Sequence, residues 1–379
     1  MSKKNILVLG NDSFNAARLD QLARESDYNF HWLLDYDYIH SFQQNSMSAI
    51  MENARSQIRQ FTGTIDGLIN LWDFPGCLMA PILCKELNLI SPSPASVFQC
   101  ENKYLSRIQQ QNVIPDCVPK FYGFDPAQSD IIENKTLPYP FWIKPVIGFS
   151  GHLGFHVRSE QDFVQALERI HDRQDLFTKP YRYLEQHIEL SPDMQHAGEK
   201  TFIAEQIIGG KQFTLEGFMV EGDVEFHGII DSYRHPNRMS FSRYEYPSIL
   251  SGKMKSRICE KANTIMRQAG FDNGTFNIEF FYDRRKDKLW LLEINTRISQ
   301  SHCELFRRVD GQLSHQIVVD IALGRRPQMP KRQGKFKVAG KLFLRAFNDG
   351  RVTHVPDRDK IERLEEEFDA IIYPTKSGH

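Results

Sequence analysis

The sequence predicts a protein of mixed α/β and α+β architecture that is divided into two or three domains. Its 379 residues are more than one ordinary hydrophobic core accommodates. Apolar, strand-like segments alternate with helical segments over residues 1–95, and beyond them several strand-like segments follow one another through short turns. Alternation is typical of a parallel sheet, and consecutive strands are typical of antiparallel sheets.

Composition and charge argue against nucleic acids and membranes as partners. Hydrophobic residues make up 41% and charged residues 25% of the chain, as in soluble globular proteins. The formal net charge is −1 and no block of basic residues stands out, so electrostatics do not favour binding to nucleic acid or a membrane surface. No apolar stretch approaches the length of a membrane span.

The cysteines and the first residues indicate a cytoplasmic protein. The six cysteines form no CxxC pair and show no zinc-ligand spacing, which is typical of scattered thiols in a reducing compartment. The start, "MSKKNILVLGND", has only a short apolar stretch, so it predicts a strand and not a signal peptide.

Residues 1–95 are expected to form a Rossmann-like domain. The strand-like segments "KNILVLGND", "FHWLLDYD" and "IDGLINLWD" are separated by the helical segments "AARLDQLARES" and "SMSAIMENARSQIRQF". The "LGNDS" turn has a lone glycine and no GxGxxG pattern, so it is most simply a tight strand-to-helix connection. Ligand binding there stays open, because open α/β sheets bind ligands at such strand ends.

A second domain is expected over residues 96–204, after the boundary segment "ISPSPAS" and the helical segment "ENKYLSRIQQQN". In "YPFWIKPVIGFSGHLGFHVRS" a strand ends at Lys144, before a glycine-containing loop and another strand. Free N–H groups of the loop and the lysine charge could bind phosphate, although glycine-rich turns between strands are common. Lys103, near a helix start, taken alone is more simply a surface lysine.

The remaining chain divides into residues 205–325 and a C-terminal tail, residues 326–379. In the third domain we expect the strands of "TFIAEQIIGGKQFTLEGFMVEGDVEFHGII", a helix ending at Gly270, and the pair "FNIEFFYD" and "KLWLLEIN". In the tail, "KFKVAGKLFLRAFNDGRVTHV" suggests an antiparallel hairpin and "FDAIIYP" a last strand. That strand stops a few residues from the end, which leaves open that the tail is incomplete.

A magnesium site is predicted where the last two strands of the third domain pair. A symmetric register sets Glu279 opposite Glu293, and like charges in that position are destabilising. A divalent cation would remove the conflict, with Asn295 as a third oxygen ligand, and such ligands suit Mg²⁺, with Mn²⁺ as an alternative. A solvated strand face carrying ordinary acids is the other reading, but the apolar neighbours disfavour it because buried acids are paired or bind ions.

Five segments in order resemble the ATP-grasp superfamily, and the resemblance covers residues 1 to about 325. They are "NKYLSR" with "VIPDCVPKF", "YPFWIKPVIGFSGHLG", "AEQIIGGKQFTLEG", "GTFNIEFFYD" and "LLEINTRISQSH". The resemblance implies an ATP-grasp fold, in which a Rossmann-like N-terminal domain precedes two α+β subdomains that clasp ATP between them.

The resemblance also implies roles for individual residues. Lys103 and Lys144 match phosphate-binding lysines, the 148–154 loop matches the lid, and Arg297 matches the arginine that stabilises the acyl phosphate. The hinge from Glu205 to Ile208 would bind adenine through its backbone. Gln212 stands where many members have a glutamate that holds the ribose hydroxyls, which a neutral amide can still do. The implied ATP-binding residues are Lys103, Lys144, Ser150, Gly151, Glu205, Gln206, Ile208 and Gln212, and the implied metal ligands are Glu279, Glu293 and Asn295.

By resemblance, the activity is that of an ATP-dependent carboxylate–amine ligase similar to L-amino-acid (dipeptide) ligases, with an acyl phosphate intermediate. "EINTR" also resembles biotin carboxylase, although the dense glycine loop of that family and a biotinyl-lysine motif are missing. Carbamoyl-phosphate synthetase halves are a further relative, but the duplicated architecture is absent. A non-catalytic nucleotide-binding protein is the remaining alternative, and the complete set of expected site residues argues against it.

The residues that bind the substrates are less defined. Arg234, Arg238 and Arg243, in the segment 229–250, could clamp a substrate carboxylate, or could simply be solvated loop residues. Ser301 and His302 lie just past Arg297 and are candidates to line the pocket, although a lone histidine is more often structural. We expect a small-molecule carboxylate and an amine as substrates, and leave a homodimer open.

Overall fold

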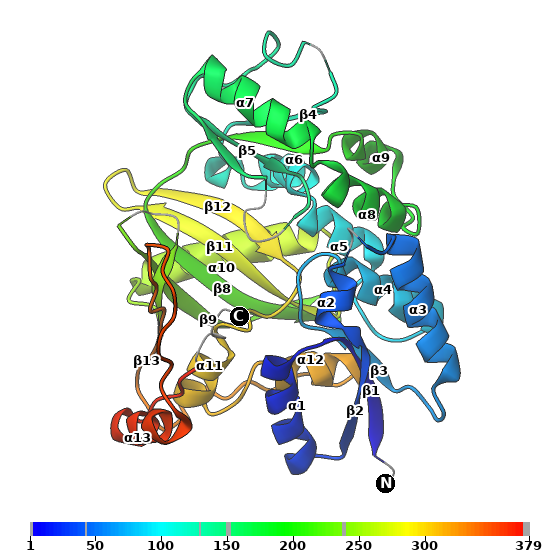
Figure 1. Cartoon of the computed structure of the whole chain (residues 1–379), viewed down its shortest axis with the longest axis vertical. Coiled ribbons are helices and arrows are strands. Elements are labelled where there is room, and N and C mark those ends of the chain that lie inside the picture. Colours follow the sequence, from blue (N-terminus) through cyan, green and yellow to red (C-terminus); the bar gives the residue numbers. More distant parts are fainter. Residues whose placement is uncertain (1–2, 42–43, 129, 149–152, 237–239, 374–379) are drawn as a thin grey trace. The chain divides into compact units, whose positions relative to one another are not determined.

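The computed structural model describes residues 3–41, 44–128, 130–148, 153–236 and 240–373 (Figure 1). The chain divides into two compact units, Met1–Leu342 and Phe343–His379, and each is described by itself. The larger unit contains three sheets, which have three, four and six strands.

The N-terminal sheet is parallel, as the alternation of strands and helices predicts. Its strand order is β2-β1-β3. The strands are β1 (Lys4–Asn11), β2 (Tyr28–Asp35) and β3 (Gly67–Asn70), and the helices of this region are α1 (Ser13–Glu25), α2 (Tyr36–Ile39), α3 (Met47–Gln60) and α4 (Gly76–Leu87). The "LGNDS" turn is a direct strand-to-helix connection, in which the Asp12 side chain accepts a hydrogen bond from the Asn15 backbone N–H and so caps α1.

A helix that comes late in the sequence of the larger unit packs against this sheet and completes its apolar core. Val319 and Ala322, on α12 (His315–Ala322), belong to the same buried cluster as Ile6 and Val8 of β1. The carboxyl ends of the three parallel strands lie at one edge of this sheet. At those ends, open parallel sheets bind their ligands.

The four-stranded sheet has the order β4-β7-β5-β6, and all its neighbouring strands are antiparallel. Phe141, Phe163 and Phe202 form the centre of its own apolar core. The strands are β4 (Phe121–Phe124), β5 (Phe141–Pro145), β6 (Phe155–Val157) and β7 (Phe202–Gln206). The helices of this region are α5 (Pro94–Glu101), α6 (Lys103–Val113), the short 3₁₀ helix η1 (Pro115–Cys117), α7 (Glu160–His171), α8 (Asp175–Glu185) and α9 (Pro192–Gly198).

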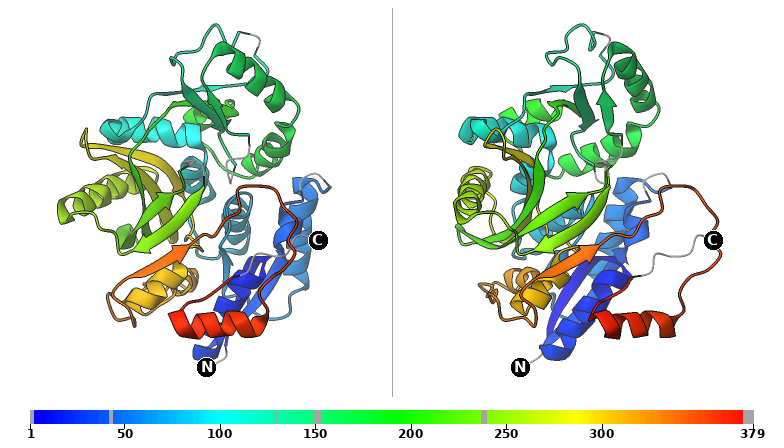
Figure 2. Two further views of the ribbon diagram at one scale, coloured as in Figure 1. Left: turned by 60° about the vertical axis from the view of Figure 1, so that its left-hand side comes forward. Right: turned by 90° about the vertical axis from the view of Figure 1, so that its left-hand side faces the viewer.

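The six-stranded antiparallel sheet has the order β12-β11-β8-β9-β10-β13. In Figures 1 and 2 it lies between the four-stranded sheet and the parallel sheet, and one apolar core runs from the N-terminal helices into it. The strands are β8 (Lys211–Val220), β9 (Asp223–Arg234), β10 (Phe241–Tyr246), β11 (Gly274–Asp283), β12 (Lys288–Asn295) and β13 (Ala339–Leu342), and the accompanying helices are α10 (Gly252–Gln268) and α11 (Cys303–Asp310).

The prediction of an antiparallel hairpin within the C-terminal tail is wrong. β13 pairs with β10, and residues 343–357 contain neither helix nor strand. Pairing with β10 extends an existing sheet, whereas a hairpin within the tail would be an isolated two-stranded ribbon, which is marginally stable. In the smaller unit, α13 (Arg358–Phe368) follows the N-cap Asp357, and the expected strand "FDAIIYP" is absent from residues 369–373.

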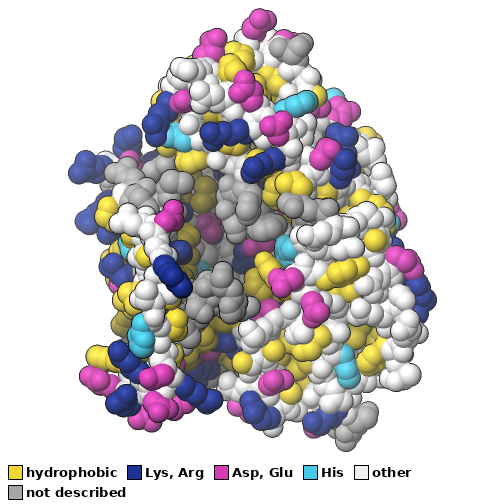
Figure 3. Space-filling model, viewed as in Figure 1, with side chains coloured by type: hydrophobic (Ala, Val, Ile, Leu, Met, Phe, Trp, Pro, Cys, Tyr) yellow, Lys and Arg dark blue, Asp and Glu magenta, His cyan; other side chains and the backbone are white. Residues whose placement is uncertain are grey.

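Two properties of the described part of the chain agree with its composition. None of its helices is long and apolar enough to cross a membrane. Figure 3 shows Lys and Arg side chains interspersed with Asp and Glu on the face in view, in line with the formal net charge of −1.

Candidate active site

The centre of the candidate site is a pair of opposed carboxylates. Glu279 on β11 is the register partner of Glu293 on β12, so the predicted pairing of these strands is confirmed. The register shifts directly after Glu279, which marks a local irregularity of the ladder. Burial, and next the negative charge of Glu293, raise the pKa of Glu279 well above its ordinary value. The two acids therefore cannot both ionise easily without a cation beside them.

Asn295 is oriented by neighbouring polar groups. Its Nδ2 donates to Asn277 Oδ1 at 3.0 Å, and Asn277 Nδ2 donates to the Arg297 carbonyl oxygen at 2.9 Å. Because the nitrogen of the Asn295 amide is engaged, its oxygen is the atom left to face a cation. Two carboxylates and one amide oxygen fit the ligand preferences of Mg²⁺ and Mn²⁺.

Lys144 is held by a buried ion-pair network. Its Nζ lies 2.6 Å from Glu205 Oε2, and Arg107 Nε donates to Glu205 Oε1, also at 2.6 Å. Burial alone would raise the pKa of Glu205, but the charges of Arg107 and Lys144 outweigh it and lower the pKa to about 2. Glu205 is therefore a charged anchor for Lys144, in addition to any contact that its backbone makes.

Arg107 connects this network to the metal strand. Its two terminal nitrogens donate to the carbonyl oxygens of Leu291 (3.0 Å) and Leu292 (2.6 Å), which directly precede Glu293. Sequence reasoning missed Arg107, although it lies within the quoted "NKYLSR" segment. The only signal was its position four residues after Lys103, on the same side of one helix.

The remaining residues expected to bind ATP are placed only in part. Asn102 caps α6, so that Lys103 is its first residue, and Lys103 Nζ donates to the Gly148 carbonyl oxygen at 3.2 Å. Gln206 is the exposed last residue of β7, and Ile208 lies in the link to β8. Ser150 and Gly151 lie outside the described residues.

Gln212 and Arg234 lead to the carboxylate pair. Gln212 is buried, and its Oε1 accepts from Arg234 Nε at 2.9 Å and Nη2 at 2.7 Å. Its Nε2 donates to Glu279 Oε2 at 2.5 Å. Both ends of the Gln212 amide thus have protein partners, and Arg234 lies beside the candidate metal site. Arg243 instead pairs with Glu245 on the exposed part of β10, which is the solvated reading, and Arg238 is outside the described residues.

Arg297 is hydrogen-bonded to Asp73, a residue that follows β3 of the N-terminal sheet. Its Nε donates to Asp73 Oδ1, although 224 positions separate the two residues. Burial alone would lower the pKa of Arg297, but the charge of Asp73 raises it above its ordinary value. Glu101 makes a second connection nearby, since it accepts from the Thr296 backbone N–H at 2.7 Å. Sequence reasoning missed Asp73 and Glu101, which carry no local sign of either contact.

His302 is buried, and its imidazole is paired with a buried carboxylate. Its Nδ1 lies 2.7 Å from Glu216 Oε1, and Glu216 Oε2 accepts a longer hydrogen bond from the Ser299 backbone N–H. The Ser301 hydroxyl lies 3.3 Å from Lys341 Nζ. These contacts are enough to explain His302 as a residue that positions the segment after Arg297, so its role toward a substrate stays a prediction.

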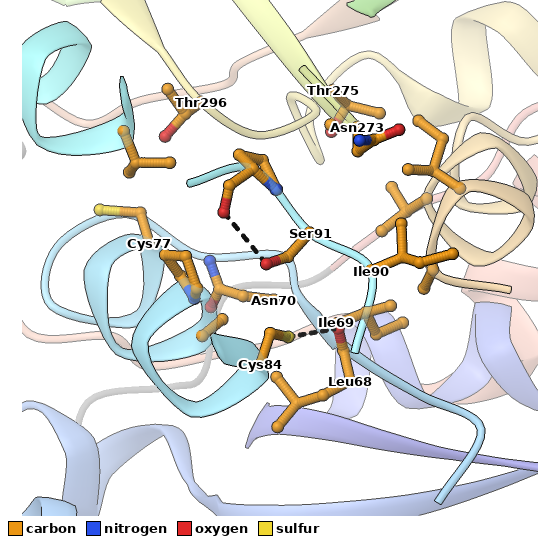
Figure 4. A pocket seen from close by; sticks show the side chains of 18 residues that line it. Leu68, Ile69, Asn70, Cys77, Cys84, Ile90, Ser91, Asn273, Thr275 and Thr296 are labelled. Carbon is orange, nitrogen blue, oxygen red and sulfur yellow. Dashed lines mark hydrogen bonds between the residues drawn. The ribbon is translucent and has the colours of Figure 1, made fainter. Parts of the chain in front are cut away.

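A cavity of about 70 Å³ borders the candidate site at Thr296, which lies between Asn295 and Arg297 on the chain (Figure 4). Its lining comes from β3, α4, the start of β11 and α12, and includes Asn70, Cys77, Cys84 and Thr275. The predicted site residues do not line it. The cavity therefore touches the candidate site at Thr296, and most of its lining belongs to the packing among β3, α4, α12 and the start of β11.

The comparisons with known proteins bear on the fold. Residues 137–304 match the ATP-grasp domain family, and the chain has an ATP-grasp fold. Among solved structures, an L-amino acid ligase from Bacillus licheniformis is similar with a TM-score of 0.68 and 17% identity, over 96% of this chain and 85% of the other. The N5-carboxyaminoimidazole synthetase from Staphylococcus aureus complexed with ADP gives a TM-score of 0.65 and 16% identity, over 97% and 87% of the two chains.

One curated relative extends beyond this chain. The uncharacterized protein y4rH from Sinorhizobium fredii is 23% identical over 298 residues, which is 77% of this chain. The match covers 55% of that relative, so the chain spans about half of its length.

Proposed function

We propose that the protein is an ATP-dependent carbon–nitrogen ligase, which joins an amino-acid-like carboxylate to an amine and releases ADP and phosphate. The observation that carries the proposal is the opposed pair Glu279 and Glu293, with Asn295 and Arg297 directly following on the chain, within an ATP-grasp fold. The likeness of the fold to an L-amino acid ligase supports the amino-acid-like carboxylate.

Glu279, Glu293 and Asn295 would hold the metal ion. When bound, Mg²⁺ would neutralise charge on the phosphate oxygens of ATP and lower the energy of phosphoryl transfer. Gln212 keeps Glu279 in place and brings Arg234 beside it, so Arg234 is suited to an anionic group of the substrate.

Lys103 and Lys144 would bind the phosphates of ATP, and the hinge from Glu205 to Ile208 would bind its adenine. Lys144 already points at a carboxylate, so an arriving phosphate finds the ammonium group in a fixed position. That arrangement lowers the entropy cost of binding, because the long side chain is ordered before ATP arrives.

Arg297 would act on the transferred group. Transfer of the terminal phosphate to the carboxylate gives an acyl phosphate, and the amine then displaces phosphate. Charge grows on oxygens in both steps, and a fixed guanidinium stabilises such charge more than it stabilises bound ATP. The anchor on Asp73 supplies the fixed orientation.

A carboxylating enzyme is the second candidate. The fold similarity to the N5-carboxyaminoimidazole synthetase favours it, and in that case bicarbonate would take the place of the organic carboxylate. Bicarbonate dependence of the reaction would distinguish this activity from amide formation.

The test is product analysis with the purified protein, ATP, Mg²⁺ and a mixture of the twenty standard amino acids. The expected products are ADP, phosphate and an amide. Glu293→Ala should abolish turnover without unfolding the protein, and Glu260→Gln, an exposed acid on α10, is the matched control. AMP and pyrophosphate as products would overturn the acyl phosphate route, and no ATP consumption with any amino acid or with bicarbonate would favour a non-catalytic nucleotide-binding protein.

A further inference from the structure

Asp73 accepts a hydrogen bond from the candidate catalytic residue Arg297, and its own side chain remains partly exposed. It follows β3, at the carboxyl end of the parallel sheet, and its Oδ1 accepts from Arg297 Nε. The Asp73 side chain is still 32% exposed, whereas that of Arg297 is 17% exposed. One side of the carboxylate is therefore engaged with Arg297, and part of the group remains accessible to a small molecule.

The neighbours of Asp73 favour a cation. Tyr36, directly after β2, packs against Trp72 with ring centroids 4.2 Å apart, and Trp72 Nε1 donates to Asp12 Oδ2 at 3.0 Å. Burial, and then the negative charges of Asp73, Asp37 and Asp12, raise the pKa of Tyr36. Aromatic rings beside carboxylates are a setting that attracts ammonium groups.

The same surroundings fix where a bound cation would lie. Asp12 and Tyr36 directly follow β1 and β2, and Asp73 comes three residues after the end of β3, so all three lie at the edge of the sheet at which such folds bind ligands. Through Arg297, this edge contacts the segment that follows the candidate metal strand. An ammonium ion on Asp73 would thus be next to the guanidinium assigned to the acyl phosphate.

We propose that Asp73 binds the amine substrate as a primary ammonium ion and accepts its proton when the amine attacks. This inference rests on the proposed ligase function and adds to it the class of amine and the residue that recognises it. The amine enters at the N-terminal domain, and the acyl phosphate forms at the six-stranded sheet.

The step balances as follows for an amine R–NH₃⁺ and an acyl phosphate R′CO–OPO₃²⁻. One proton passes from nitrogen to the Asp73 carboxylate, and the freed lone pair forms the C–N bond. The C–O bond to phosphate breaks, and its electron pair leaves with the phosphate. The second nitrogen proton goes to that phosphate, which gives R′CO–NH–R and HPO₄²⁻, and Asp73 returns its proton to solvent.

Hydroxylamine, used as an alternative nucleophile, distinguishes two roles of Asp73: accepting a proton from the amine substrate and anchoring Arg297. An alkyl ammonium such as that of lysine has a pKa of about 10.4, so an amine arrives charged at neutral pH. Hydroxylamine is largely uncharged under those conditions and attacks acyl phosphates to give hydroxamates. A residue that only holds Arg297 would matter equally for both nucleophiles.

The experiment compares wild type with Asp73→Asn, using the twenty amino acids with and without excess hydroxylamine. We expect amide formation, measured by mass spectrometry, to fall by about 10²–10⁴, a loss typical of removing a general base. Hydroxamate formation should stay near the wild-type rate, because the asparagine oxygen can still accept from Arg297. Asp20→Asn, an exposed acid on α1, should change neither rate.

Two results would overturn the inference. Equal loss of amide and hydroxamate in a folded Asp73→Asn would make Asp73 a support for Arg297 alone. If that variant failed to fold, Asp73→Glu takes its place, and unchanged selectivity between the nucleophiles would count against the proposal. Hydroxamate from wild type shows that the ligase function stands in either case, whereas its absence would remove the proposed function itself.

Discussion

Glu279 and Glu293 make the stability of the metal-free protein depend on pH. The pKa of Glu279 is raised in the folded protein, so the folded chain keeps a proton that the unfolded chain releases near the ordinary carboxyl pKa. The folded state then binds more protons than the unfolded state in this window. The free energy of unfolding therefore falls as pH rises from the ordinary value toward the raised one.

Replacing Glu293 with glutamine should abolish activity and weaken this pH dependence, because burial of Glu279 remains and only the charge of Glu293 is removed. Without Mg²⁺ at pH 8, we expect Glu293→Gln to be more stable than wild type by about 1 kcal/mol, the cost of opposed like charges on a sheet. Mg²⁺ should raise the Tm of wild type and not that of the variant, as measured by thermal melts at pH 5 and pH 8. A wild-type Tm that responds to neither pH nor Mg²⁺, with Glu260→Gln as control, would contradict the metal assignment.

Substitution of Arg297 should impair catalysis and leave the binding of ATP nearly unchanged. We expect Arg297→Ala to keep nearly normal affinity for an ATP analogue and to lose about 10²–10³ in turnover, because in the proposed reaction the guanidinium stabilises developing charge. Arg297→Lys should recover little, since an ammonium cannot replace a planar fork that also contacts Asp73. Calorimetry beside phosphate-release assays measures both quantities, and parallel losses in the two would make Arg297 a ground-state or structural residue.

At the scale of elements, one buried arginine joins α6 to strands of two different sheets. Arg107 pairs with Glu205 on β7 and donates to two carbonyl oxygens of β12. Both members of the ion pair are nearly inaccessible, with side chains 2% and 6% exposed. Removing only one of them would leave a buried charge without its main partner, which is strongly destabilising.

We expect Arg107→Met to lower the free energy of unfolding by about 3–5 kcal/mol. The double variant Arg107→Met with Glu205→Gln should recover part of the loss, because the buried carboxylate that has lost Arg107 and keeps only Lys144 is then gone. Urea titrations of wild type, both single variants and the double variant give the coupling between the two positions. Additive effects would show that the pair does not act as one unit.

At the scale of the whole larger unit, buried histidines should weaken the fold in acid. Burial is the main reason that the pKa values of His227 and His315 are lowered to about 3 from the ordinary 6.5. Below pH 6.5 the unfolded chain takes up protons that the folded chain does not. Stability is therefore fully present above about 6.5 and falls as pH drops toward 3.

His227→Phe should flatten this acid dependence. Within the described residues, neither ring nitrogen of His227 has a hydrogen-bond partner, and aromatic Phe218 and Phe306 lie beside it. The slope of unfolding free energy between pH 6 and pH 4 should decrease by about 1.4 kcal/mol per pH unit, the value for one proton. Urea titrations at several pH values measure the slope, and the exposed His171→Gln is the control. An unchanged slope would mean that His227 titrates alike in both states.

The sequence by itself determined the elements and the parts of the site that are local. Period-two and helical patterns with their end signals defined the parallel sheet, the antiparallel strands and α10. The opposition of Glu279 and Glu293 could be derived because a short turn joins the two strands, so the register is fixed within about twenty residues.

Only the tertiary structure decided which distant residues complete the site. Asp73 contacts Arg297 across 224 positions of the sequence, and Arg107 contacts Glu205 across 98. Gln212 contacts Glu279 across 67 positions and also binds Arg234. The pairing of β13 with β10, which replaced the expected hairpin, was decided in the same way. The physical reason is that local patterns specify which face of an element is apolar, whereas the partner of a buried charge or a strand edge depends on how those faces pack together.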